Sequence, residues 1–218
     1  MKSALVIFDF DGTLADTWRD IAEAVNETLT SAGIRAVDGP SARFGIGEGV
    51  LPLLRRHLGP AASESRVRTV YDDFARRYEG QTLRHTALYP GMEDALDALG
   101  WARLAILSNK PNVYLQRQLQ ELAIASRFEI ALGGDSLPRT KPDPELVRTV
   151  VERTGFRSER IWVVGDSGID IELGRAAGAS TIGCAWGLRG RDELVAAGAD
   201  HVAEHPRELP PLIGSADN

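Results

Sequence analysis

ALVIFDFDGTLADT, residues 4–17, is the stretch of sequence that decides the fold. Its first five residues are all apolar, which is typical of a short strand buried on both faces in a parallel sheet. Two aspartates, a glycine and a threonine follow closely, so polar chemistry begins where the strand ends. Because ligands of open α/β sheets bind at the carboxyl ends of strands, this loop predicts a ligand site.

Apolar runs and helical patterns alternate along the rest of the chain. Further apolar runs lie at residues 102–107, 161–164 and 180–185, with a weaker one at 128–132. Between or beside them, apolar residues recur at helical spacing over 92–99, 115–122 and 146–151. This alternation predicts an α/β fold with a doubly wound, mostly parallel, Rossmann-like sheet.

Residues 16–86 break the alternation. They contain no convincing strand, but three apolar stripes at helical spacing lie at 18–29, 50–58 and 67–78. An all-helical block directly after the first strand predicts an insertion over the sheet. We therefore expect an α/β core domain of residues 1–15 and 87–218, a helical cap domain of residues 16–86, and a surface extension from residue 206 to the end.

Composition narrows the class of protein. The 218 residues carry a net charge of −6, which argues against a nucleic-acid binder. The sequence contains no apolar run of about 18 residues, and no signal peptide is recognisable, so we expect no membrane partner. A single cysteine, Cys184, excludes an internal disulfide, so a cytoplasmic location is expected. Only three of the 25 basic residues are lysines: Lys2, Lys110 and Lys141.

Acidic residues follow the predicted strands. Asp9 and Asp11 follow the first, Asp166 and Asp170 follow the run at 161–164, and Ser108 follows the run at 102–107. Carboxylates gathered at one sheet edge repel one another and raise each other's pKa. A divalent cation would relieve this repulsion, and oxygen-only ligands favour Mg²⁺. Because Mg²⁺ completes its shell with water and substrate phosphate, the expected partner is a small phosphorylated metabolite.

The loop after the first strand suggests the reaction. Asp9 could attack phosphorus as a nucleophile and form an aspartyl-phosphate. Asp11 could protonate the leaving oxygen and later deprotonate water. Gly12 lets the backbone turn its N–H groups, with Thr13, toward phosphate. An isolated Asp-Gly pair is typical of a simple turn, but the apolar strand followed by D-x-D-G-T favours chemistry.

Four segments, in order, resemble the motifs of the haloacid dehalogenase-like phosphohydrolase superfamily: DFDGTLADT (9–17), SNK (108–110), KPDP (141–144) and GDSGID (165–170). The resemblance spans about residues 4–186, and the helical block resembles the family's C1-type cap. It implies a catalytic set, a metal set and a substrate-binding set. The catalytic set is Asp9 as nucleophile, Asp11 as acid and base, Ser108 as phosphoryl donor and Lys141 as charge partner. The metal set is the Asp9 carboxylate, the Asp11 backbone carbonyl and Asp166, with Asp170 orienting the metal shell or Lys141. The substrate-binding set is Gly12, Thr13, Asn109 and Arg43.

The sequence excludes some reactions of that superfamily. Dehalogenases lack the second aspartate and the metal, whereas Asp11 and Asp166 are present here. Phosphonatases of this cap type need a cap lysine, and residues 14–88 contain none. The corresponding cap region, ARFGIGEGVLPLL at residues 42–54, does not contain the pattern that is typical of β-phosphoglucomutases. A phosphomonoester hydrolase similar to the phosphoglycolate phosphatases is favoured, acting on 2-phosphoglycolate.

Several alternatives stay open from the sequence. They are a pyrophosphatase, a sugar-phosphate phosphatase, a β-phosphoglucomutase-like isomerase and a non-catalytic relative that binds a phosphorylated metabolite. Arg43, Arg55, Arg56 and the glycine-rich segment 44–49 could recognise the leaving group, although arginines on a solvated helix face explain the same pattern. Monomer and homodimer are equally compatible with the sequence.

Overall fold

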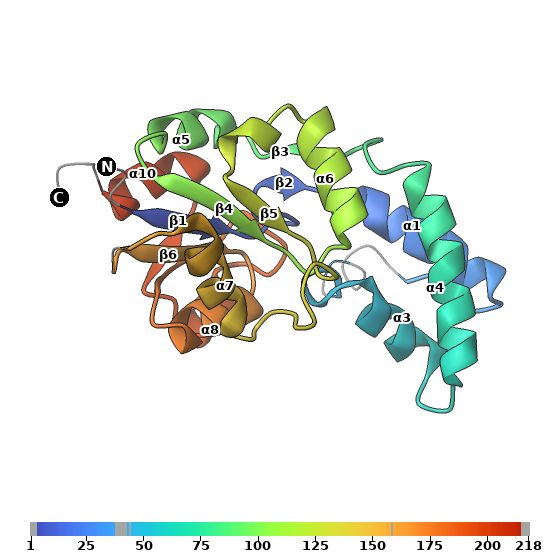
Figure 1. The fold of residues 1–218 in the computed structure, drawn as a ribbon. Coiled ribbons are helices and arrows are strands. Elements are labelled where there is room, and N and C mark those ends of the chain that lie inside the picture. The colour runs from blue at the N-terminus through green and yellow to red at the C-terminus, as the bar shows by residue number, and fades with distance from the viewer. Residues whose placement is uncertain (1–3, 38–42, 44, 158, 215–218) are drawn as a thin grey trace.

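The computed structural model describes residues 4–37, 43, 45–157 and 159–214. Its main sheet has six parallel strands in the order β5-β4-β1-β6-β7-β8 (Figure 1). The central strand is β1 (Leu5–Phe8). The others are β4 (Arg103–Leu107), β5 (Ile130–Leu132), β6 (Ile161–Gly165), β7 (Ser180–Cys184) and β8 (His201–Ala203). Leu5 is in register with Arg103 of β4 and Ile161 of β6, so β1 has a neighbour on each side.

Helices cover both faces of the sheet. They are α5 (Met92–Ala98), α6 (Asn112–Glu121), α7 (Glu145–Thr154), α8 (Gly168–Ala176), α9 (Arg191–Ala196) and α10 (Leu209–Ile213). Alternate residues of β1 enter different cores, because Val6 and Phe8 pack with one set of helices and Leu5 and Ile7 with the other. A continuous apolar run is what such two-sided burial requires. The predicted doubly wound fold is therefore confirmed.

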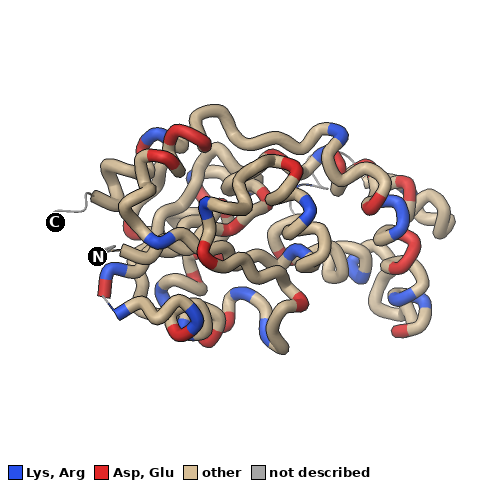
Figure 2. The backbone as a smooth tube through the Cα atoms, turned by 45° about the horizontal axis from the view of Figure 1, so that its top comes forward, with Lys and Arg blue, Asp and Glu red and all other residues tan. Residues whose placement is uncertain are grey.

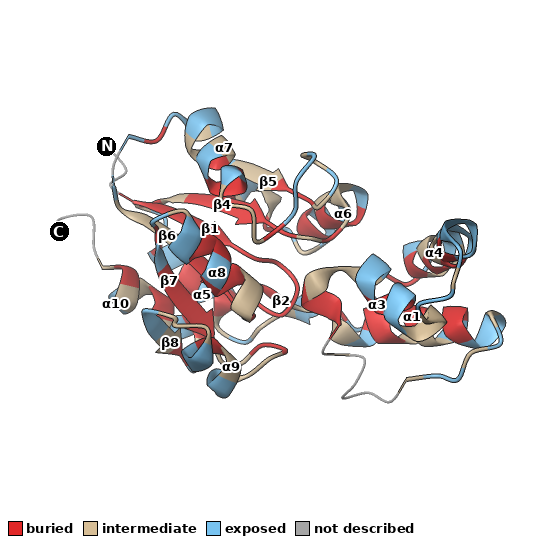
Figure 3. Cartoon of the chain, turned by 90° about the horizontal axis from the view of Figure 1, so that it is seen from below, coloured by how far each residue is buried: buried red, intermediate tan, exposed pale blue. Residues whose placement is uncertain are grey.

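The cap helices, α1 (Trp18–Ser31), α3 (Val50–Leu58) and α4 (Glu64–Glu79), lie beside the sheet (Figures 1 and 3). They enclose an apolar cluster of their own, in which the rings of Phe74 and Tyr78 stack 5.3 Å apart. Their outer faces are exposed and their facing sides buried (Figure 3). The turn η1 (Ile46–Glu48) lies between α1 and α3 in the chain.

A two-stranded antiparallel ribbon, β2 (Ala15–Asp16) with β3 (Ala87–Leu88), joins the two places where the chain leaves and re-enters the α/β layer. These strands lie at the predicted boundaries of the insertion, and the division at 16–86 remains a prediction. Core helix α6 also contacts the end of α4, since the Tyr114 hydroxyl donates a hydrogen bond to the Ala75 carbonyl (3.1 Å).

Two sequence expectations differ from the structure. Strand β8 was not anticipated, because three residues without a long apolar run give little signal. The predicted surface extension is wrong for residues 206–213, where Pro206, Leu209 and Ile213 are buried in η3 (Pro206–Glu208) and α10. Among the described residues, no helix is long and apolar enough to cross a membrane.

Candidate active site

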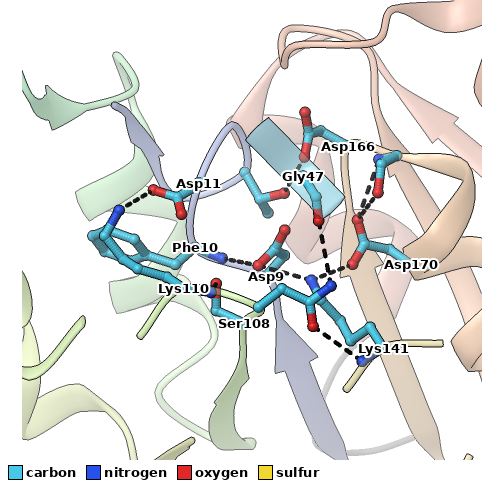
Figure 4. Close-up of polar contacts among 12 residues, drawn as sticks. Asp9, Phe10, Asp11, Gly47, Ser108, Lys110, Lys141, Asp166 and Asp170 are labelled. Atoms are coloured by element: carbon cyan, nitrogen blue, oxygen red, sulfur yellow. Dashed lines mark hydrogen bonds and ion pairs between the residues drawn. The ribbon is translucent and has the colours of Figure 1, made fainter. Parts of the chain in front are cut away.

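The sheet order brings the predicted residues together. Asp9 follows β1, Ser108 follows β4 and Asp166 follows β6. Because β4 and β6 flank β1 in parallel, their carboxyl ends meet at one edge. Lys141 reaches the same point from the loop before α7, and Figure 4 shows these side chains converging. Residues about 160 positions apart in the chain thus form one site.

Asp9 is held by two donors on one oxygen. Its Oδ1 accepts a hydrogen bond from the Phe10 backbone N–H at 2.7 Å and an ion pair from Lys141 Nζ at 2.9 Å. No hydrogen bond from the residues that the structure describes reaches its Oδ2. The carboxylate is therefore fixed in orientation with one oxygen left for a cation or a phosphorus atom.

Lys141 is fixed from the opposite side by Asp170, whose Oδ1 lies 2.7 Å from its ammonium nitrogen. Oδ2 of Asp170 accepts hydrogen bonds from the hydroxyl and backbone N–H of Ser167, which forms a capping box at the start of α8. Both oxygens of Asp170 are thus engaged by the protein. The contact with Lys141 is shown, and the role of Asp170 in orienting Lys141 or the metal shell stays a prediction.

Asp166 lies against the loop of the first motif. Its Oδ2 accepts a hydrogen bond from the Leu188 backbone N–H at 2.7 Å, and its Oδ1 from the Thr13 hydroxyl at 3.4 Å. Gly12 has a positive φ of 84°, and a Cβ there would lie 2.4 Å from Asp166 Oδ2. Only glycine permits both that backbone conformation and this approach.

The backbone N–H groups of Gly12 and Thr13 are engaged within the loop. Gly12 donates to the Ala15 carbonyl and Thr13 to the Phe10 carbonyl. In this structure the two residues shape the loop and hold Asp166, and their binding of phosphate remains a prediction.

Burial and like charge dominate the electrostatics. Burial, with the Asp170 and Asp11 carboxylates, raises the pKa of Asp9 to about 7 even though Lys141 opposes the shift. Burial, followed by the charges of Asp170 and Asp9, raises the pKa of Asp166 well above its usual range. Carboxylates in this state gain from a positive charge placed between them.

The donor set fits a divalent cation. Asp9, Asp166 and Asp170 each offer an oxygen, and these atoms lie within 4.8 Å of one another. All three are buried, and the ligand atoms are carboxylate oxygens, which suit a hard cation. Since Asp170 is committed to Lys141 and Ser167, the first two are better placed to bind it.

Asp11 has a partner that the sequence analysis missed. Its Oδ1 lies 2.8 Å from Lys110 Nζ, and both side chains are almost fully buried. Figure 4 shows the Asp11 carboxylate turned toward Lys110 and away from Lys141. Burial would lower the pKa of Lys110, but the Asp11 charge and the Tyr78 hydroxyl raise it above its ordinary value. The scarcity of lysine in the chain was the one available signal.

Ser108 and Asn109 lie within the site but differ in role. Ser108 Oγ accepts a weak hydrogen bond from the Lys110 backbone N–H at 3.3 Å, and its hydroxyl is available as a donor. Asn109 Oδ1 accepts from the Lys141 backbone N–H at 3.0 Å, and its amide donates to the Gly47 carbonyl at 3.4 Å. Asn109 therefore holds the lysine loop and the glycine-rich cap segment.

The candidate cap arginines do not converge on the carboxylates. The Arg43 guanidinium lies 5.3 Å from the Trp18 ring centre, and its buried Nε–H has no acceptor among the described residues. Arg55 and Arg56 form exposed ion pairs, at 2.6 Å with Glu64 and 3.0 Å with Glu48. These two behave as residues of a solvated helix face. Residue 44 of the glycine-rich segment lies outside the described residues.

Comparisons with known proteins agree with this geometry. The family profile of haloacid dehalogenase-like hydrolases matches residues 6–184. The chain belongs to this family. It is 31% identical over 216 residues to phosphoglycolate phosphatase of Vibrio parahaemolyticus, covering 94% of this chain and 93% of the relative. It is 29% identical over 219 residues to N-acetylmuramic acid 6-phosphate phosphatase of Pseudomonas aeruginosa, covering 99% and 97%.

A solved structure shows the same fold. The protein described as a predicted phosphoglycolate phosphatase from Haemophilus somnus superposes with a TM-score of 0.90 at 26% identity, over 98% of this chain and 99% of that chain. With its family and these relatives, the chain is a phosphatase, a hydrolase of phosphoric monoesters. The predicted class of enzyme is confirmed.

Proposed function

We propose that this phosphatase hydrolyses a small phosphomonoester through an aspartyl-phosphate on Asp9, with Mg²⁺ as cofactor and 2-phosphoglycolate as substrate. The observation that carries the proposal is the buried cluster of Asp9, Asp166 and Asp170, in which Lys141 pairs with Asp9 and Asp170. A non-catalytic binding protein has no need for a nucleophile oriented by two donors.

The proposed reaction has two steps. The Asp9 carboxylate attacks phosphorus, the bond from phosphorus to the leaving oxygen breaks, and Asp11 gives its proton to that oxygen. Water then attacks the phosphoryl group while Asp11 takes its proton, and the bond to Asp9 breaks to release phosphate. Asp11 faces Lys110 in the structure, so its side chain must rotate toward the leaving oxygen.

Positive charge and donors stabilise the transferring group. Lys141 offsets charge on Asp9 and on the phosphoryl oxygens, and Ser108 donates a hydrogen bond to one of them. Mg²⁺ would be held by the carboxylates of Asp9 and Asp166 and the backbone carbonyl of Asp11, and when bound it offsets the negative charge of carboxylates and phosphate. Gly12, Thr13 and Asn109 shape the pocket that receives the phosphate.

The leaving group faces the cap. Arg43, whose buried Nε–H has no acceptor among the described residues, is the cap arginine that we assign to substrate binding. A sugar-phosphate phosphatase is the second candidate, because the Pseudomonas aeruginosa relative is named for a sugar phosphate. A pyrophosphatase and a β-phosphoglucomutase-like isomerase are further outcomes of the test.

Phosphate release from a panel of phosphorylated compounds, with Mg²⁺ or with EDTA, tests the proposal. The panel includes 2-phosphoglycolate, pyrophosphate, hexose phosphates and N-acetylmuramic acid 6-phosphate. We expect the highest kcat/KM on 2-phosphoglycolate, loss of activity in EDTA, and loss of about 10⁴-fold or more in Asp9→Asn. Comparable rates on every ester would refute the substrate, and no release from any ester would refute the activity.

A further inference from the structure

We propose that Lys110 sets the specificity of the site: its ammonium binds a carboxylate on the leaving group, in exchange for the Asp11 carboxylate that it pairs with in the structure. This inference rests on the proposed phosphatase activity and names the substrate class that the site would prefer. It concerns a residue for which the mechanism above has no role.

Lys110 is a buried cation at the junction of core and cap. Its side chain is only 3% exposed, and its nitrogen lies 5.8 Å from the ring centre of Phe10 and 5.1 Å from that of Tyr78. Phe10 belongs to the loop of the first motif and Tyr78 to cap helix α4. Aromatic faces favour a cation but do not replace a counter-ion in such a desolvated place. Asp11 is the one carboxylate paired with Lys110 among the described residues.

A small cavity adjoins this ion pair. Its volume is about 20 Å³, which is room for little more than one water molecule. Asp11 and Lys110 are the only charged residues among those that line it, and apolar side chains such as Ile46, Val50 and Phe74 form much of the rest. The space lies between the acid-base residue and the cap, where a leaving group would project. Rotation of the Asp11 carboxylate away from Lys110 would add the volume of that group to this space.

The two roles of Asp11 conflict. To reach the leaving oxygen beside Asp9, its carboxylate must turn away from Lys110. A buried ammonium left without a partner costs several kcal/mol, so a neutral leaving group would oppose the rotation. A leaving group that carries its own carboxylate restores the pair and frees Asp11 to act. Lys110 would then select esters of small hydroxy acids.

Arg43 is the competing candidate for this carboxylate. It does not line the cavity, and its guanidinium lies over the Trp18 ring instead. The two residues can therefore be separated by substitution, with methionine replacing each long cationic side chain. Lys110→Arg serves as the conservative variant.

The experiment compares 2-phosphoglycolate with 2-hydroxyethyl phosphate, an ester of similar length without the charge. We expect the wild-type protein to prefer 2-phosphoglycolate in kcat/KM. Lys110→Met should lower kcat/KM for it about 100-fold more than for the neutral ester, since a charged contact is lost. Lys110→Arg should retain part of the preference, whereas Arg43→Met should lower kcat/KM for both esters alike and leave their ratio near that of the wild-type protein.

Three outcomes would overturn the inference: equal losses on both esters in Lys110→Met, loss of the preference in Arg43→Met alone, or a wild-type protein with no preference. If Lys110→Met does not fold, the wild-type preference and its survival in Arg43→Met decide the matter. Hydrolysis of neither ester by the wild-type protein would instead refute the proposed function, so the two failures are distinguishable.

Discussion

The floor of the site, formed by Asp9, Asp166, Asp170 and Lys141, and the cap helices differ in how far their charged side chains are exposed to solvent. On the floor, Lys141 and its partners Asp9 and Asp170 are at most 3% exposed. In the cap, the Arg55–Glu64 pair is 45% and 78% exposed. Residues with side chains of both charges are interspersed along the backbone (Figure 2). The charged side chains of the floor, however, are shielded from solvent.

This difference separates the chemistry from the recognition of the substrate. Buried charges depend on one another, because removal of one leaves the others unpaired in a medium of low dielectric. Exposed pairs contribute little and are replaced by water when broken. Substitutions of the charged residues of the floor should therefore impair stability and activity, whereas substitutions on the outer face of the cap should leave the reaction unaffected.

Lys141→Met should cause the largest effect, because it leaves Asp9 and Asp170 without their shared cation. We expect the free energy of unfolding of the metal-free protein to fall by about 3–5 kcal/mol at pH 8. The rate of phosphate release should fall at least 100-fold. Urea denaturation followed by circular dichroism measures the first and a phosphate assay the second.

Arg55→Gln is the matched control for that variant, since it also breaks an ion pair. Its denaturation midpoint and its activity should match the wild-type protein within error. If the two variants were equally destabilised, the contrast between floor and cap would be refuted.

Mg²⁺ should stabilise the protein in a pH-dependent manner. Folding raises the pKa of Asp9 from 3.8 to about 7, so its protonated form favours the folded state. The contribution is fully present below about pH 4 and is lost as pH rises toward 7 in the metal-free protein. Mg²⁺ needs the ionised carboxylates, so its benefit should grow over the same range.

Thermal unfolding with and without Mg²⁺ measures this. At 100 times the dissociation constant, stabilisation of about 2.7 kcal/mol is expected at pH 8, a rise in Tm of roughly 5–10 °C. The rise should be much smaller at pH 5, and small at both values in Asp9→Asn. A rise that is the same at pH 5 and pH 8 would contradict a site made of these carboxylates.

Sequence reasoning predicted that the acidic residues of the floor lie together, although the strand order itself was not predicted. Apolar runs that end in Asp9, Ser108 and Asp166 suffice to place their side chains at one edge once the sheet is parallel. The capping box of Ser167 and Asp170 was not predicted, although its two residues lie three positions apart. These features can be inferred from local sequence, because each depends on residues that are close together in the chain.

The missed features depend on distant packing. The pairing of Lys110 with Asp11 requires the loops after two strands to meet, and nothing near either residue indicates it. The short strand β8 and the buried helix α10 contain too few apolar residues to show the periodic pattern from which a strand or a helix is predicted. Arg43, Arg55 and Arg56 looked alike in sequence, and only their surroundings separate them.

Gly12→Ala and Gly59→Ala compare floor and cap at two glycines of positive φ, 84° and 83°. Both substitutions incur the cost of a residue with positive φ, about 1–3 kcal/mol. The added Cβ meets Asp166 at position 12 and nothing within 4 Å at position 59. Crowding should add about 2 kcal/mol at position 12, measured by urea denaturation, together with a loss of activity confined to that variant. Equal losses of stability would show that the loop can move away from Asp166.

Asp20→Asn offers the smallest effect and the hardest test of the comparison. Asp20 lies on cap helix α1, yet its carboxylate is fully buried. It accepts hydrogen bonds from the backbone N–H groups of His85 and Thr86 and from the Thr86 hydroxyl, at 2.7–3.1 Å. These donors belong to the segment that returns the chain to β3.

Asparagine keeps one acceptor oxygen but directs an amide at the remaining donors, so a loss of about 1–2 kcal/mol is expected. The control is Glu23→Gln on the same helix, where the exposed carboxylate pairs with Arg84 at 3.3 Å, and little change is expected there. Urea denaturation of the two variants shows whether burial or location in the cap governs the cost. A loss in Asp20→Asn as small as in Glu23→Gln would mean that the cap as a whole tolerates change. A larger loss assigns Asp20, by its burial and its three donors, to the rigid part of the molecule.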